Sequence, residues 1–315
     1  MMDLSVNLCG IRFQNPVGIA SGNAGYGIEY QSVCGFSNRD VGAVFLKGTT
    51  LEPKLGNKPE RVMESPSGLL NSVGLQNPGA HEVIAGYLPK LDLSESQFII
   101  NVSGSSVEEY AKVVRLFDQT ELPAIEINIS CPNVKKGGAA FGNDPDMAAR
   151  VVEACRANTD KPLIVKLSPN QTDIAEGARR VIDAGADALS AINTLMGMDI
   201  NIHTREPGLG NNQGGLSGPA IKPVALLKVH QVYQVAKQHN VPIIGLGGIA
   251  SAEDAIEFFL AGASMVAIGT AVAKDPLIVK KVNKGIAKYL KQHNLDSVSE
   301  LTGKLQLHTD TVLCG

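Results

Sequence analysis

Residues 242–270 read PIIGLGGIASAEDAIEFFLAGASMVAIGT and contain one complete succession of strand, helix and strand. The runs Pro242 to Leu246 and Met265 to Ile268 are short and almost continuously apolar, as expected for strands that are buried on both faces. Between them, Ala252 to Leu260 has apolar residues at helical spacing. The stretch therefore predicts a βαβ unit with parallel strands.

The same alternation recurs through the preceding part of the chain. Six further apolar runs have the length of buried strands: Pro16 to Ala20, Ala43 to Leu46, Phe98 to Val102, Ala124 to Ile129, Leu163 to Leu167 and Ala188 to Ile192. Amphipathic helical patterns lie between the later runs, at Val107 to Phe117, Met147 to Ala157, Ile174 to Ala184 and Val224 to Gln238. Eight strands with following helices predict an α/β protein with a closed (β/α)8 (TIM) barrel. A doubly wound open sheet is the competing architecture, but the GxGxxG turn that it usually carries is absent after the first strand.

Two segments depart from this alternation. Leu4 to Phe13 alternates in polarity around a turn at Cys9-Gly10, which predicts an N-terminal β-hairpin that closes the bottom of the barrel. Thr50 to Ser96 is long and poor in strands, and we expect an elaborated loop at the C-terminal face rather than a second domain. Residues 1–315 are thus expected to form a single barrel domain.

Charge and cysteine content exclude several classes of function. The 28 basic and 31 acidic residues are spread along the chain, so no basic stripe indicates a nucleic-acid or membrane partner. The first residues lack the pattern of a signal peptide, and no apolar run is long enough to span a bilayer, so we expect a cytoplasmic protein. The five cysteines have no CxxC spacing and the six histidines are scattered, so no metal or iron–sulfur site is expected in this chain.

In a (β/α)8 barrel the active site lies at the C-terminal ends of the strands, so the polar residues after each apolar run are the candidates. Two glycine-containing pairs, Gly247-Gly248 and Gly269-Thr270, follow the last two runs. One such pair could simply make a tight turn. Two pairs in these particular loops favour a phosphorylated ligand held by backbone N–H groups and a short helix start.

Two lysines and one cysteine occupy similar positions. Lys47 and Lys166 each end an otherwise apolar strand, where an ammonium group is costly unless an anion or polar ligand meets it. Either lysine could be a general base, a Schiff-base lysine or a charge stabiliser, or could extend to solvent at the rim. A lone cysteine is usually a small buried hydrophobe, but Cys131 follows a strand and precedes a proline and a glycine-rich loop, which favours a catalytic role.

Asparagines are abundant at the expected mouth of the barrel: Asn71, Asn101, Asn128, Asn133 and Asn193. Side-chain amides match the alternating donors and acceptors of a ring imide or a flavin edge. Carboxylates are expected to be nearly absent there. This pattern argues against glycosidase chemistry, which needs paired acids.

These stretches together resemble the class I dihydroorotate dehydrogenases, most closely their NAD-linked subtype. The resemblance covers nearly the whole chain and is carried by residues 15–22, 47–50, 71–79, 128–133, 165–170, 192–194, 215–220 and 245–249. It implies that FMN is held by Ser21, Lys47, Gly48, Asn101, Asn128, Lys166, Ile192, Gly218, Gly247, Gly248, Gly269 and Thr270. It also implies that the pyrimidine contacts Lys47, Asn71, Ser72, Val73, Gly74, Leu75, Asn128, Asn133, Asn193 and Thr194.

The resemblance further implies a reaction, a step of de novo pyrimidine biosynthesis. Cys131 would remove the C5 proton of dihydroorotate while the C6 hydride passes to the flavin, giving orotate, and Lys166 would stabilise the reduced flavin. In the NAD-linked subtype the electrons pass to a separate subunit that carries FAD and an iron–sulfur cluster, around a homodimer of barrels. A fumarate-using subtype, a dihydropyrimidine-type flavoenzyme and a non-catalytic barrel that binds a phosphorylated ligand remain alternatives.

Overall fold

The protein is described here by a computed structural model that covers residues 2–130 and 142–308. Eight parallel strands close into a barrel, and they follow one another around it in chain order. These strands are β3 (Val17–Ile19), β4 (Ala43–Phe45), β7 (Gln97–Val102), β8 (Ile125–Asn128), β9 (Leu163–Lys166), β10 (Ala188–Ala191), β15 (Ile243–Gly245) and β16 (Met265–Ile268). The predicted (β/α)8 barrel is therefore confirmed, and each of the eight predicted runs forms one of its strands.

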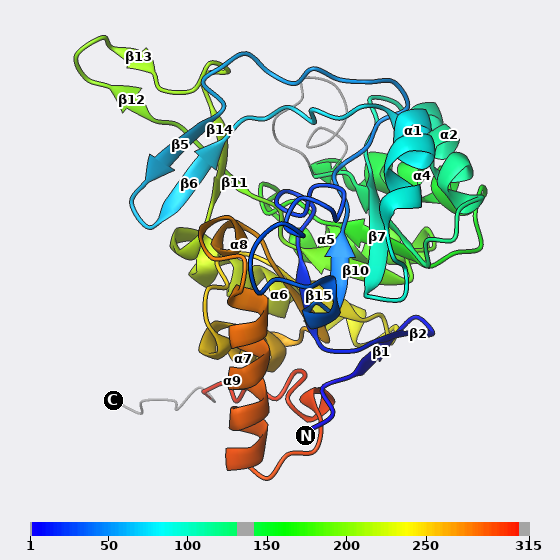
Figure 1. Ribbon diagram of the computed structural model, residues 1–315, viewed down its shortest axis with the longest axis vertical. Coiled ribbons are helices and arrows are strands. Elements are labelled where there is room, and N and C mark those ends of the chain that lie inside the picture. The colour runs from blue at the N-terminus through cyan, green and yellow to red at the C-terminus, as the bar shows by residue number, and fades with distance from the viewer. Residues whose placement is uncertain (1, 131–141, 309–315) are drawn as a thin grey trace, which may run out of the picture.

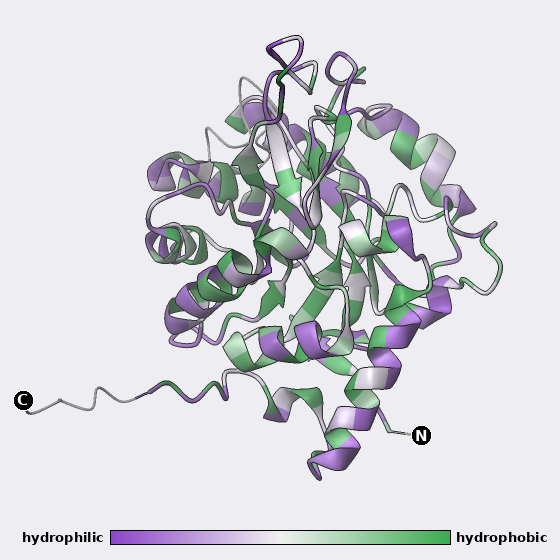
Figure 2. Ribbon diagram, turned by 90° about the vertical axis from the view of Figure 1, so that its left-hand side faces the viewer, coloured by the Kyte–Doolittle hydropathy of each residue, from purple (hydrophilic) through white to green (hydrophobic). Residues whose placement is uncertain are grey.

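Six longer helices surround the barrel: α2 (Val107–Asp118), α4 (Pro145–Arg156), α5 (Ile174–Asp183), α6 (Lys222–Ala236), α7 (Ala252–Ala261) and α9 (Ile278–Gln292). Ser106, Asp144, Asp173 and Ser251 begin four of them, and each side chain accepts hydrogen bonds from the first helical N–H groups. In Figure 2 the barrel strands have mostly apolar colours, whereas the surrounding helices carry polar colours on their outer sides. Within the described ranges, no helix combines the length and the apolar character that crossing a bilayer requires.

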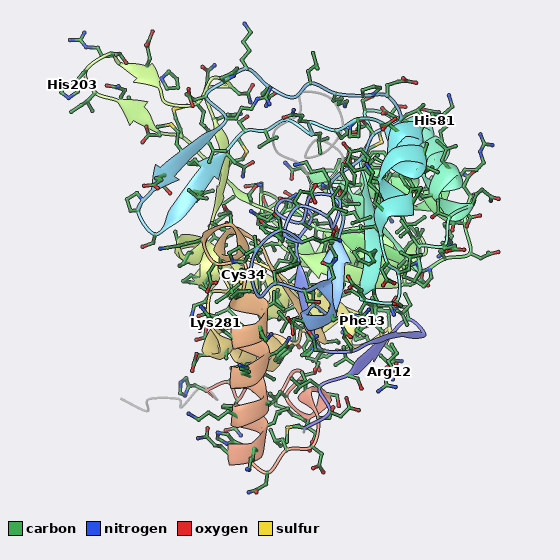
Figure 3. All side chains as sticks on the ribbon, viewed as in Figure 1. Arg12, Phe13, Cys34, His81, His203 and Lys281 are labelled. Atoms are coloured by element: carbon green, nitrogen blue, oxygen red, sulfur yellow. The ribbon has the colours of Figure 1, made fainter. Side chains whose placement is uncertain are left out.

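The side chains of each barrel strand alternate between two cores. Outward residues such as Val44, Ile127 and Val165 pack against the helices, and inward residues such as Phe45 and Ile99 fill the barrel. The hairpin β1 (Val6–Leu8) and β2 (Ile11–Phe13) adds Leu8 and Phe13 to the inner core, and Figure 3 labels Phe13 at this end. The turn forms at Cys9 and Gly10, which both have positive φ. The predicted hairpin at the bottom of the barrel is confirmed.

The segment from Thr50 to Ser96 is more ordered than the expected loop. It contains β5 (Val62–Ser65) and β6 (Gly68–Asn71), which pair with each other. β6 also pairs with β14 (Gly214–Ser217), and β14 pairs with β11 (Leu195–Gly197), which completes a four-stranded antiparallel sheet. Figure 1 shows this sheet beside the C-terminal end of the barrel, with the small hairpin β12 (Ile200–Asn201) and β13 (Glu206–Pro207) extending from it. We call residues 62–71 and 195–217 the arm. Its outermost loop carries His203 (Figure 3).

The described residues also form shorter helical segments: α1 (Ala80–Glu82), α8 (Thr270–Lys274), η1 (Asn38–Asp40), η2 (Val83–Tyr87), η3 (Leu88–Lys90), η4 (Pro219–Ile221) and η5 (Val298–Glu300).

Candidate active site

Lys166 lies inside the mouth of the barrel. Ile164 belongs to the inner core, so Lys166, two residues further along β9, also faces inward. Its register neighbours are Asn128 on β8 and Ser190 on β10, and only 5% of the lysine is exposed. Among the described residues, none forms a hydrogen bond or ion pair with its ammonium group. A lysine that is buried and has no partner in the described part of the chain suits a site that receives an anionic or polar ligand.

The expected asparagines form a connected cluster at the same level. Asn128 Nδ2 donates to Asn101 Oδ1 at 3.2 Å, and Asn193 Nδ2 donates to Ser130 Oγ at 2.8 Å. Ser130 joins the two halves, because its N–H and hydroxyl donate to Asn128 Oδ1 at 3.2 and 3.0 Å. Asn193 Oδ1 accepts the N–H of Thr194 at 2.8 Å. We call Asn101, Asn128, Ser130 and Asn193 the amide cluster.

The inward face of β8 also carries Glu126, which the analysis of the sequence missed. This carboxylate is only 1% exposed. It accepts hydrogen bonds from Asn101 Nδ2 at 2.5 Å and from the Ser190 hydroxyl at 2.7 Å. The expectation that carboxylates are nearly absent concerned the mouth of the barrel, and Glu126 lies one layer below it. Glu126 precedes Asn128 by two residues, and this period-two spacing could have indicated it.

The arm brings the expected pyrimidine residues together from two distant loops. Asn71 Nδ2 donates to the carbonyl of Gly215 at 3.2 Å, and Gly215 packs so closely on Thr194 that a Cβ would overlap the threonine hydroxyl. After Asn71, the chain passes through buried Ser72 to Val73, Gly74 and Leu75. A Cβ on Gly48 would lie 3.2 Å from Leu75 Cδ2 and 2.9 Å from Asn101 Oδ1. The 71–75 loop, the loop after β4 and the amide cluster therefore meet.

The first two barrel loops contribute Ser21 and Lys47. Ser21 is buried, and half-buried Lys47 is anchored by its backbone N–H, which donates to Gly25 O at 2.7 Å. The Lys47 carbonyl accepts the hydroxyl of Thr49, which also contacts Tyr26. Burial raises the pKa of Tyr26 to about 12. The Tyr26 hydroxyl therefore remains protonated near neutral pH and supports the loop as a neutral group.

The glycines after the last strands form a narrow cradle with Gly218. Gly247, Gly248 and Gly218 all have positive φ, of 127°, 86° and 94°. A Cβ on Gly248 would lie 2.9 Å from Gly218 O, and Thr270 Oγ1 donates to Ser217 Oγ at 2.8 Å. Within the described residues, the N–H groups of Gly247, Gly248 and Gly269 have no internal acceptor. Three loops therefore converge, and in the described part of the chain two of them present backbone N–H groups without an acceptor, which is the arrangement that a phosphate group needs.

The cradle and the amide cluster adjoin. Ile192 and Asn193 are consecutive at the end of β10, and a Cβ on Gly247 would lie 3.4 Å from Ile192 Cγ1, while Asn193 bonds to Ser130. One elongated ligand can therefore contact both.

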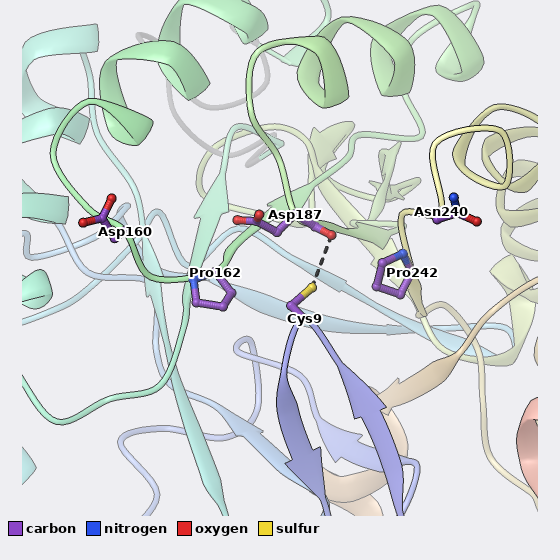
Figure 4. A pocket seen from close by; sticks show the side chains of 6 residues that line it. All are labelled: Cys9, Asp160, Pro162, Asp187, Asn240 and Pro242. Atoms are coloured by element: carbon purple, nitrogen blue, oxygen red, sulfur yellow. Dashed lines mark hydrogen bonds between the residues drawn. The ribbon is translucent and has the colours of Figure 1, made fainter.

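Two of the expected residues, Cys131 and Asn133, lie outside the described residues. Among the other cysteines, burial raises the pKa of Cys9 to about 11 and that of Cys155 to about 12, so neither thiol is suited to act as a base near neutral pH. Cys9 also lies at the wrong end of the barrel. There it lines a pocket with Asp160 and Asp187 and donates to the Asp187 carbonyl at 3.2 Å (Figure 4).

Metal ligands do not gather in the described part of the chain: it contains no group of three His, Cys, Asp or Glu side chains placed to hold an ion.

Comparison with known proteins decides the family. The sequence profile of dihydroorotate dehydrogenase matches residues 3–290. The chain belongs to the dihydroorotate dehydrogenase family. Its activity is the flavin-dependent oxidation of dihydroorotate.

Individual dihydroorotate dehydrogenases match over almost their full lengths. One from Desulforamulus reducens, named dihydroorotate dehydrogenase B (NAD(+)), catalytic subunit, is 48% identical over 97% of this chain and 99% of its own. A Bacteroides thetaiotaomicron protein of the same name is 48% identical over 98% of this chain and 100% of its own. An Aquifex aeolicus protein, provisionally named dihydroorotate dehydrogenase A (fumarate), is 49% identical over 96% and 98%. The resemblance to this family is confirmed, whereas the relatives differ in the electron acceptor that their names give.

Proposed function

We propose that this chain is the catalytic subunit of an NAD-linked dihydroorotate dehydrogenase, with FMN and dihydroorotate bound together at the barrel mouth. The adjacency of the glycine cradle and the amide cluster at Ile192 and Asn193 carries this proposal. As part of the same proposal, residues 1–315 act as one catalytic domain.

The described residues fit FMN in three respects. The cradle of Gly218, Gly248 and Gly269 offers backbone N–H groups to its phosphate. The buried ammonium of Lys166 offers a positive charge, and Asn101 and Asn128 offer amides to a heterocycle. When bound, FMN supplies the hydride acceptor.

On the pyrimidine side, we assign the proton transfer to Cys131. Its thiolate takes the C5 proton of dihydroorotate, while Asn193, Thr194 and the 71–75 loop fix the ring. Lys166 would stabilise the negative charge of the reduced flavin that results from transfer of the C6 hydride. Asn133 is assigned to the same ring from the resemblance alone.

For the electron acceptor, we propose a partner subunit with FAD and an iron–sulfur cluster, arranged around a homodimer of this chain. Two relatives are named as catalytic subunits of NAD-linked enzymes, which supports a partner. Exposed Met198, Ile200 and Ile202 on the arm, with exposed fractions of 55%, 59% and 78%, support a contact surface beside the site. A cytoplasmic location belongs to the same proposal, and the free thiols of Cys9, Cys34 and Cys155 agree with it.

The relative from Aquifex aeolicus supports a second candidate, in which fumarate is the acceptor and no partner is needed.

Anaerobic mixing of the FMN-loaded chain with dihydroorotate tests the function. We expect the visible absorbance of the flavin to bleach with dihydroorotate and not with dihydrouracil. Reoxidation of the bleached flavin by fumarate alone would favour the second candidate, and reoxidation by NAD only after addition of an FAD and iron–sulfur subunit would favour the first. Failure to bind FMN, or bleaching by dihydrouracil alone, would contradict the assignment.

The cradle provides a binding prediction. Gly248→Ala is expected to raise the dissociation constant of FMN about 10-fold, because an alanine at φ 86° meets Lys222 Cβ at 2.8 Å and displaces the loop. Quenching of FMN fluorescence during titration of the apoprotein measures this. Gly22→Ala is the matched control, since Gly22 is exposed and its Cβ would meet no atom within 4 Å. Equal affinities of Gly248→Ala and the unmodified protein would refute the cradle.

A further inference from the structure

Glu126 is a buried acid that the mechanism above does not use. It lies on the inward face of β8, directly below Asn128, and is 1% exposed. Each of its two oxygens accepts one hydrogen bond, Oε2 from Asn101 and Oε1 from Ser190. In the described part of the chain, no lysine, arginine or histidine lies within ion-pair distance of it. A carboxylate in this position is costly to bury, so its hydrogen bonds carry particular weight.

The bonds around Glu126 run in one direction only. A carboxylate can only accept, and the backbone N–H of Ser130 at the far end can only donate. Between these ends stand Asn128, which accepts from Ser130 and donates to Asn101, and Asn101, which accepts from Asn128 and donates to Glu126. Reversing either amide would place two donors or two acceptors against each other. The two ends therefore permit one orientation of both amides.

We propose that Glu126 is a positioning residue, whose carboxylate fixes the orientation of the Asn101 amide and thereby the edge that Asn101 and Asn128 present to the bound heterocycle. Glu126 acts through Asn101 and touches no ligand itself. Ser190 holds the second oxygen and leaves the first one aimed at Asn101. The proposal rests on the proposed function for the identity of the ligand, FMN, and on the hydrogen bonds for the direction of the amides.

Three variants separate orientation from charge and from general packing. Glu126→Gln can present Oε1 to Asn101 and its amide nitrogen to the Ser190 hydroxyl, so FMN affinity should stay within about threefold of the unmodified protein. Glu126→Leu removes the acceptor and leaves a buried N–H unpaired, so the dissociation constant of FMN should rise about 10–100-fold. Ser190→Ala keeps the bond to Asn101, so FMN affinity should again change less than threefold even where the variant is less stable.

Titration of each apoprotein with FMN and the absorbance change of the bound flavin on adding orotate give the readouts. The orotate-induced spectrum should be preserved in Glu126→Gln and altered in Glu126→Leu. If Glu126→Gln and Glu126→Leu lost equal amounts of FMN affinity, the proposal would be overturned, because the charge of the side chain rather than its hydrogen-bond acceptor would then matter. An equal loss of FMN affinity in Ser190→Ala and Glu126→Leu would also overturn the proposal.

A swap at the Asn101 contact decides the question without any ligand. Asn101→Asp turns an acceptor towards the Glu126 carboxylate and should lower the unfolding midpoint in urea. Adding Glu126→Gln supplies a donor to the new aspartate and should restore most of that midpoint. Lack of restoration would refute the direct contact, even where Glu126→Leu does not fold. If FMN fails to bind the unmodified protein, the proposed function falls, whereas the swap still tests Glu126.

Discussion

Cys131→Ala is expected to slow anaerobic flavin reduction by dihydroorotate by about 10²–10⁴-fold, the usual contribution of a general base. FMN affinity should change little, because the base is assigned to the pyrimidine side. In the unmodified protein the rate should rise with pH and level off above the pKa of the thiol, since an ordinary cysteine has a pKa of about 8.5 and only the thiolate accepts the proton. Stopped-flow absorbance between pH 6 and 10 measures both effects.

Cys9→Ser is the matched control for this experiment. Burial raises the pKa of Cys9 to about 11, and the residue lies at the hairpin turn at the opposite end of the barrel. Its replacement should leave the rate and its pH dependence unchanged. A Cys131→Ala variant that reduces its flavin as fast as the unmodified protein, or a rate independent of pH, would show that another group is the base.

Lys166→Met should slow flavin reduction by about 10²–10³-fold, because the site loses the one cation that faces its interior from β9 and no longer stabilises developing negative charge. The free energy of unfolding of the apoprotein should not fall. Methionine fills a similar volume and removes no hydrogen bond to any of the described residues. Stopped-flow absorbance and urea unfolding give the two measurements.

Lys161→Met provides the opposite pattern and serves as the control. Lys161 Nζ donates to the carbonyls of Phe117 and Thr120, far from the barrel mouth. Its loss should lower the free energy of unfolding by about 1–3 kcal/mol and leave flavin reduction unchanged. If Lys166→Met instead resembled Lys161→Met, the lysine would be structural and the proposed charge stabilisation would be incorrect.

The barrel could be predicted from the sequence because its strands are short, continuous apolar runs. Runs such as Leu163 to Leu167 are buried on both faces, so hydrophobicity alone marks their limits to within one or two residues. The arm could not be predicted in this way. The strand Val62–Ser65 is half exposed, and the sheet depends on pairing between Leu69 and Ser217, whose distance in sequence hides the contact.

The site was predictable at the strand ends and less so beneath them. Asn101 and Asn128 lie near the ends of their apolar runs and Asn193 directly follows the next one, and the three form one cluster, as expected from the barrel rule. Glu126 lies within a run and was passed over, although its spacing from Asn128 placed it on the same face. The assigned roles of Cys131 and Asn133 stay predictions.

The antiparallel pairing of β6 with β14 has a mechanical consequence for ligand exchange. Backbone pairing and the Asn71 side chain join β6, which ends at Asn71, to β14, which ends at Ser217. Neither strand can therefore move away from the site without the other. Admission of a pyrimidine must either displace both as one flap or pass beside them.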